Sequence, residues 1–155
     1  MPKIDVAAIA EVNTTGYPPP FDAIVAGRFR KRLGNAGGLT QFGVNLCRLE
    51  PGAATAQRHW HEKEDELVYV LDGEVVLIED EGETVLSPGD AATFKAGVAN
   101  GHHLVNRSDR DALILEVGSR ISNERAEYSD IDMQVVEENG KSRYLHKDGA
   151  PYPQR

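Results

Sequence analysis

The sequence has little cysteine and no long apolar run, and these two shortages limit the disulfides, the compartment and the membrane association that can be expected. Cys47 is the only cysteine among 155 residues, so no intrachain disulfide can form and a reducing compartment is expected. The first residues lack the apolar core of a signal peptide, and no apolar run has the length of a membrane span. We therefore expect a cytoplasmic protein that does not bind a membrane.

Positive charge is also scarce. The formal net charge is −8, with 17 basic and 25 acidic residues, which argues against a nucleic-acid partner. One basic cluster, residues 28–32, is interpreted as a solvated or subunit-facing segment. Glycine-rich phosphate loops, a Gly-x-Ser-x-Gly elbow and a helix pair of the DNA-binding type are all absent from the pattern.

What the sequence does contain is a series of short β-prone runs. Glycine and proline turn signals separate them between about residues 40 and 118, and no long helical pattern interrupts them. The runs are 40–49, 66–71, 74–79, 83–86, 91–94, 103–105 and 112–117. This spacing predicts an antiparallel β-sandwich or barrel within one domain, residues 1–155.

The two ends of the chain have a different texture. Residues 1–39 predict an irregular arm, since three prolines at 18–20 exclude regular structure, and residues 21–33 are expected to lie as a short element over the main body. Residues 119–155 predict an irregular C-terminal extension. It is expected to contain a helical turn near 122–126 and a hairpin around Asn139-Gly140.

The most informative pattern is His59-x-His61-x4-Glu66. In a strand, residues two apart share a face, so His59 and His61 point the same way. Residues 63–65 allow a bend, and Glu66 opens the next β-prone run. One β-hairpin can therefore turn two imidazoles and a carboxylate toward a single metal ion.

A further imidazole comes from His102, which lies four residues before Asn106. His103 is adjacent, and only one of the two can point inward on a regular strand. The spacing to Asn106 favours His102. Three histidines and one glutamate suit one divalent transition metal ion, such as Zn, Mn, Fe or Ni.

These residues belong to the longer pattern Gly52-x6-His59-x-His61-x4-Glu66-x6-Gly73, which closely resembles the first motif of the cupin superfamily. The second cupin motif is similar to Gly89-Asp90, Gly97 and His102-x3-Asn106. It departs from the usual motif at Lys95, where proline is usual, and at Asn100-Gly101, which lengthens the segment before His102. The resemblance covers about residues 40–118.

The resemblance implies an all-β fold, the antiparallel double-stranded β-helix or jelly-roll barrel, flanked here by the irregular N-terminal arm and C-terminal extension. It also implies a metal ion held by His59, His61, Glu66 and His102, a small-molecule ligand or substrate, and a homodimer. The whole chain resembles a subgroup of small bacterial cupins often described as sugar-phosphate isomerases.

Because the cupin fold hosts many functions, three hypotheses stay open. The first is a metal-dependent isomerase acting on a sugar or sugar phosphate, for which no catalytic base can be identified. The second is an iron-dependent dioxygenase, and the third is a small-ligand sensor without turnover. A phosphate would need a cation, and the sequence offers Arg48, Arg58, Lys95 and Arg107.

Some neighbouring residues are expected to have structural roles. Glu62, Glu64 and Asp65 lie in the bend after His61 and are interpreted as a solvated turn. Trp60 is expected to pack outside the barrel or at a subunit contact, and Phe94 in the core.

Overall fold

The β-prone runs and glycine turns of the sequence form twelve strands in the computed structural model, which describes residues 2–153. The strands are β1 (Arg28–Arg32), β2 (Phe42–Leu49), β3 (His59–His61), β4 (Glu66–Asp72), β5 (Val75–Glu79), β6 (Gly82–Leu86), β7 (Ala91–Phe94), β8 (His103–Val105), β9 (Ala112–Ser119), β10 (Arg125–Tyr128), β11 (Gln134–Glu138) and β12 (Lys141–Leu145). The helical segments are η1 (Val6–Ala8), η2 (Ala23–Val25) and α1 (Leu33–Ala36). None of these three has the length of a membrane-spanning helix.

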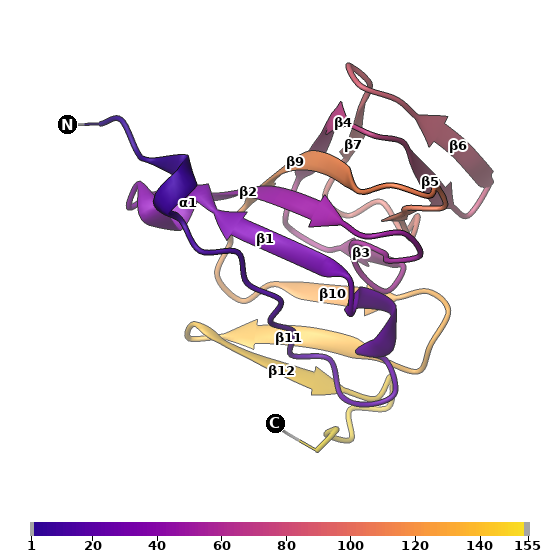
Figure 1. Ribbon diagram of the computed structural model, residues 1–155. Coiled ribbons are helices and arrows are strands. Elements are labelled where there is room, and N and C mark those ends of the chain that lie inside the picture. The colour runs from indigo at the N-terminus through magenta and orange to yellow at the C-terminus, as the bar shows by residue number, and fades with distance from the viewer. Residues whose placement is uncertain (1, 154–155) are drawn as a thin grey trace.

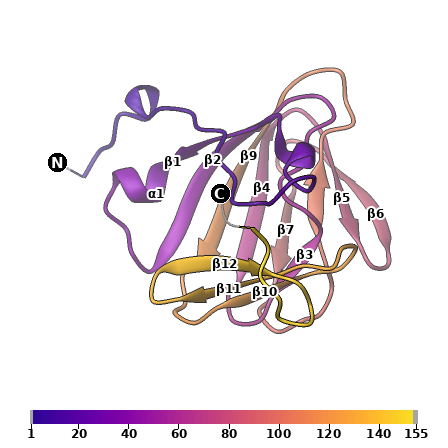
Figure 2. The same cartoon turned by 90° about the horizontal axis from the view of Figure 1, so that it is seen from below.

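One layer of the fold is a five-stranded antiparallel sheet in the order β1-β2-β9-β4-β7. The opposite layer contains two smaller sheets, β12-β11-β10-β3 and β6-β5-β8. Single bridges, His59↔His102 and Ala54↔Val105, join these two sheets next to β3 and β8. Figure 1 shows the layers edge-on, and Figure 2 shows β10, β11 and β12 running across the five-stranded sheet.

This arrangement is the all-β jelly roll that the sequence predicts, and all seven expected β-prone runs are strands. The late hairpin is also present, with Asn139 at φ 54° and Gly140 at φ 77° in the turn between β11 and β12. The helical turn expected near 122–126 is wrong. That segment turns at 122–123 and then enters β10, because residues 125–127 pair with β11 and 126–128 with β3.

Both chain ends contribute strands beyond residues 40–118. β1 pairs with β2 along its whole length, from Arg28↔Leu49 to Arg32↔Asn45, so the element expected over the main body is an edge strand of the sheet. Earlier residues form an irregular arm that bridges this strand at Val12↔Arg30. At the other end, β10 lies directly beside β3.

The interior holds two apolar clusters. The larger one is formed by residues that alternate inward from both layers: Cys47, Leu49, Ala53, Val68, Val70, Val75, Leu77, Leu86, Leu104, Ala112 and Ile114. The smaller one joins the N-terminal arm to the C-terminal strands and consists of Tyr17, Val25, Tyr128 and Met133. The larger cluster fills one end of the barrel, and polar side chains occupy the other end.

Candidate metal centre

Three histidine side chains surround the carboxylate of Glu66. The Nε2 atom of His102 lies 2.8 Å from Glu66 Oε2, and that of His59 lies 3.9 Å from the same oxygen. The Nε2 atom of His61 lies 3.6 Å from Glu66 Oε1. Ligand atoms of His59, His61 and Glu66 all lie within 4.8 Å of one another, which is a spacing that a single metal ion can bridge.

The backbone brings these residues together from distant parts of the chain. His59 and His61 share a face of β3, as their spacing predicts. The backbones of His59 and His102 exchange two hydrogen bonds, of 3.2 and 2.9 Å. Glu66 is the first residue of β4 and pairs with Gly118.

Protonation in the cluster fits a metal site. The Nδ1 atom of His59 lies 2.8 Å from the carbonyl oxygen of Gln57, which holds the proton on Nδ1 and leaves the Nε2 lone pair for a ligand. Burial lowers the pKa of His59 to about 3. Burial alone would raise the pKa of Glu66, but His102, His59 and His61 lower it to about 2. A neutral imidazole and an ionised carboxylate are the forms that bind metal.

The structure brings His102, and not His103, to Glu66. His103 has its Nδ1 atom 2.9 Å from the carbonyl oxygen of Ala56 instead. The ring of His102 stacks on Phe94 with the centroids 3.5 Å apart. Phe94, expected in the core, is only partly buried against the core and lines the site, so it holds the orientation of His102.

The sequence analysis did not predict two glutamates that lie beside the cluster. Glu64, interpreted as part of a solvated turn, has a side chain only 21% exposed, and its Oε2 lies 3.8 Å from His61 Nδ1. Glu124 is buried, with Oε1 3.4 Å from the same nitrogen. Its other oxygen accepts a hydrogen bond from the backbone N–H of Lys63. Nothing in the local sequence relates residue 124 to residue 61, which β10 brings close.

His59, Glu66 and His102 lie in the wall of a cavity of about 470 Å³, which is the size of a small-molecule site. The N-terminal arm contributes Thr14 and Tyr17 to the lining, and β12 contributes Tyr144. A second cavity of about 200 Å³ reaches the same cluster and is lined by the half-buried Trp60.

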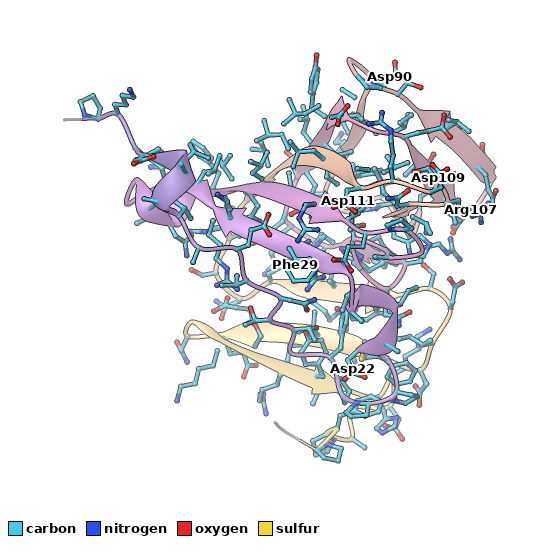
Figure 3. All side chains as sticks on the ribbon, viewed as in Figure 1. Asp22, Phe29, Asp90, Arg107, Asp109 and Asp111 are labelled. Atoms are coloured by element: carbon cyan, nitrogen blue, oxygen red, sulfur yellow. The ribbon has the colours of Figure 1, made fainter. Side chains whose placement is uncertain are left out.

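Most of the cations considered for a phosphate lie elsewhere. Arg48 pairs with Glu11 and Asp111, and Arg58 with Asp80 and Asp130. Arg107 pairs with Glu83 and lies beside the β5–β6 hairpin in Figure 3. Lys95 lines only the smaller cavity.

The larger cavity is lined instead by three arginines, Arg28, Arg30 and Arg120, of which the first two belong to the cluster interpreted as solvated or subunit-facing. That interpretation is wrong for these two, because they alternate inward along β1. Arg28 is buried, with 6% of its surface exposed, and Arg30 forms an ion pair with Glu116 of β9.

Comparison with known proteins agrees with this geometry. A family profile described as a cupin domain matches residues 45–118. No curated protein matches the chain.

Solved structures give a closer relation. A cupin-superfamily sugar phosphate isomerase from Silicibacter pomeroyi is 47% identical, covers 98% of this chain and 97% of its own, and has a TM-score of 0.94. A protein from Acidithiobacillus ferrooxidans, provisionally a sugar phosphate isomerase, is 27% identical over 84% of both chains, with a TM-score of 0.74. The polyketide cyclase RemF from Streptomyces resistomycificus shares only the fold, at 20% identity, a TM-score of 0.64, and coverage of 77% of this chain and 79% of its own.

Proposed function

Since the chain belongs to the cupin superfamily, we propose that it is a metal-dependent enzyme acting on a small polar substrate, in the manner of a sugar or sugar phosphate isomerase. The observation that carries the proposal is the convergence of three histidine Nε2 atoms on the Glu66 carboxylate in the wall of a cavity. The isomerase described for Silicibacter pomeroyi, similar over almost the whole chain, supports the reaction class.

We take His59, His61, Glu66 and His102 as the ligands of one divalent transition metal. The mixed nitrogen and oxygen donors and the Nε2 lone pair of His59 fit such an ion. When bound, the metal supplies a Lewis acid that polarises a substrate carbonyl. The chain's own residues orient this site, since Phe94 stacks on His102 and the Gln57 carbonyl holds His59 in one tautomer.

Proton transfer in an isomerisation needs a base that is free to act. Three glutamates line the larger cavity. Glu66 faces the histidines, and Arg30 holds Glu116. Glu64 remains, fixed by a 2.9 Å hydrogen bond from the backbone N–H of Ile121, and burial raises its pKa. We therefore assign proton transfer at the substrate to the Glu64 carboxylate.

The test is elemental analysis of protein purified without chelators, beside a His59→Ala/His61→Ala variant. We expect about one metal ion per chain in the wild type and almost none in the variant. A matched control is His146→Ala, since His146 contacts Asp132 near the C-terminus, outside the cluster. A wild-type protein that holds no metal after reloading would contradict the proposal.

The reaction class is tested separately with the metal-loaded protein. Aldose and ketose phosphates are screened for interconversion by NMR, and oxygen uptake is followed with an electrode in parallel. Interconversion that Glu64→Gln abolishes, with metal content unchanged, is the expected result. Iron with substrate-dependent oxygen uptake would favour the dioxygenase hypothesis, and saturable binding without turnover would favour a sensor.

We also propose a homodimer formed through the outer face of the five-stranded sheet. Rows of apolar side chains cross three strands there, since Val44 and Leu67 both pair with Val117, and Leu46 and Tyr69 both pair with Leu115. Leu67 and Tyr69 are 36% and 39% exposed in the single chain. Contiguous exposed apolar faces of this kind mark interfaces. Light scattering should give a dimer mass for the wild type and a monomer for Tyr69→Lys.

A further inference from the structure

Arg28 and Arg30 form a basic pair on the inner face of β1. Their strand partners in β2, Leu49 and Cys47, are fully buried, so both arginines point into the barrel. The intervening Phe29 lies on the opposite face, where Arg48 covers its ring at 4.5 Å. The pair lines the same cavity as His59 and Glu66.

Backbone carbonyl groups hold the two guanidinium groups together. Arg28 Nη1 donates to the carbonyl oxygen of Thr55 at 2.6 Å, and Arg30 Nη2 donates to the same oxygen at 3.3 Å. Arg28 Nη2 also donates to the carbonyl oxygen of Thr14, in the N-terminal arm, at 3.1 Å. Thr55 precedes His59 by four residues, so the segment that anchors the arginines also carries a proposed metal ligand.

The pair leaves one positive charge uncompensated. Glu116 neutralises Arg30 through two hydrogen bonds, of 2.7 and 2.8 Å. Within residues 2–153, Arg28 has no carboxylate at ion-pair distance, and its described hydrogen bonds go to carbonyl oxygens. A buried cation without a counter-charge is costly, so the site favours an anion that would supply one.

Hydrogen-bond donors remain for such an anion. Arg30 Nη1 and Arg28 Nε form no hydrogen bond within the described part of the chain. The buried side-chain atoms that lack a partner there are only the Nδ1 atoms of His61 and His102. The two unused guanidinium nitrogens are not among these fully buried atoms, and guanidinium donors match the oxygen atoms of phosphate and carboxylate.

The strand register places this charge close to the proposed metal ligands. Glu66 pairs with Gly118 of β9, and Glu116 lies two residues away on that strand. Two residues of an antiparallel strand span about 7 Å. A small molecule of a few carbon atoms can therefore reach both the histidine cluster and the arginine pair.

We propose that Arg28 and Arg30 form an oxyanion subsite, which binds a phosphate or carboxylate group of the substrate while its other end faces the metal ligands. The inference rests on the proposed function only in taking this cavity as the substrate site. It narrows the substrate class to small anionic molecules.

The test is calorimetric titration of inorganic phosphate, and separately of acetate, into the full chain. Each titration is run with metal-loaded and with chelator-treated protein, because phosphate can also bind a metal directly. The chelator-treated wild type is expected to bind at least one of the two anions. Arg30→Gln should weaken this binding about tenfold. Lys31→Gln, on the outer face of the same strand, removes the same charge and should change it by less than about twofold.

Glu116→Gln gives a change of opposite sign. It removes the negative charge that competes with the ligand and leaves an amide oxygen for Arg30, so anion binding should become stronger. A merely structural role of the Arg30–Glu116 pair would weaken binding in both variants. Loss of binding in both, an equal loss in Lys31→Gln, or no binding of either anion by the wild type would overturn the proposal.

If Arg30→Gln does not fold, the double variant Arg30→Gln/Glu116→Gln is tested in its place, because it replaces the ion pair with two amides and leaves no unpaired carboxylate. It should bind the anion more weakly than Glu116→Gln alone, and equal binding by these two would contradict the proposal. The His59→Ala/His61→Ala variant separates the two proposals. If this variant loses the metal and still binds the anion, the result supports the anion subsite independently of the metal site. If the wild type binds metal but neither anion, the result refutes the anion subsite and leaves the proposed metal site intact.

Discussion

The two ends of the barrel interior are built by the same three strands and differ in chemistry. Toward one end, β2, β4 and β9 present Leu49, Val70 and Ile114, each fully buried. Toward the other end, the same strands present their inward polar residues: Asn45, Glu66 and Glu116. We call these the apolar end and the polar end.

The difference separates stability from function. Apolar side chains at one end exclude water and contribute most of the burial energy. At the polar end, the same inward positions place charged groups around a cavity, which we propose as the site of the metal and the substrate. Removing residues from one end should therefore affect folding, and removing them from the other should affect binding.

The largest effect is expected at the apolar end. Ile114→Ala leaves a cavity where no solvent enters and should lower the free energy of unfolding by about 3 kcal/mol, measured by urea denaturation. Val85→Ala, at a residue 55% exposed, is the matched control and should have a much smaller effect. Metal content should stay unchanged in Ile114→Ala, and its loss would mean that the two ends are not independent.

Lowering the pH should destabilise the protein through titratable groups at the polar end. The folded-state pKa of His59 is about 3, below its ordinary 6.5, and that of Glu66 is about 2, below 4.5. At a pH between the folded and the ordinary pKa of each group, the unfolded chain binds more protons than the folded chain. The contribution of these groups to stability is therefore complete above about pH 6.5 and is lost as the pH falls. For metal-free protein we expect a loss of about 2 kcal/mol between pH 7 and pH 5, mainly from His59.

Urea denaturation at the two pH values measures this loss. His59→Gln should reduce it, because glutamine does not titrate. A metal-free protein that is equally stable at pH 7 and pH 5 would show that His59 is not buried in its neutral form.

A smaller effect is expected at the edge of the polar end. Glu124→Gln removes the carboxylate beside His61 and should weaken metal binding about tenfold, measured by competition with a chelator. Glu127→Gln is the control, because this substitution makes the same change in charge at a nearby residue that pairs with Arg125. Equal metal affinities in the two variants would show that Glu124 does not contribute to metal binding.

The smallest effect concerns Cys47, which lies between the two ends on β2. Its side chain is fully buried, and burial raises the pKa of the thiol, so the reactive thiolate is suppressed. We expect no reaction with a thiol reagent in the native protein and complete reaction in urea. Rapid labelling of the native chain would indicate that water from the polar end reaches this position.

Local sequence predicted the strands between residues 40 and 118 well, because alternation and turn residues are short-range signals, but it predicted a helical turn where β10 begins. The candidate metal ligands His59, His61 and Glu66 could be selected for a similar reason, since they lie within eight residues. His102 needed a choice against His103, and only the bridge between His59 and His102 places one of them beside Glu66.

Other residues could not be assigned from the sequence, for physical reasons that each involve a distant partner. Arg28 and Arg30 alternate visibly along their strand, but a basic run in an arm has the composition of a solvated surface. Glu124 contacts His61 only because β10 pairs with β3. Phe94 has the character of a core residue, and its position at the cavity follows from stacking on His102.

The sequence by itself determined the strands between residues 40 and 118 and a histidine and glutamate cluster suited to a metal, because these depend on residue type and short spacing. The jelly-roll class followed from the resemblance of the motifs to those of cupins. The tertiary structure alone decided which end of each strand faces the cavity, which histidine completes the cluster and which charges lie beside it. Alternation states that two side chains share a face of a strand. Only the pairing of distant strands determines what that face meets, and therefore whether it is buried in the core or forms a binding site.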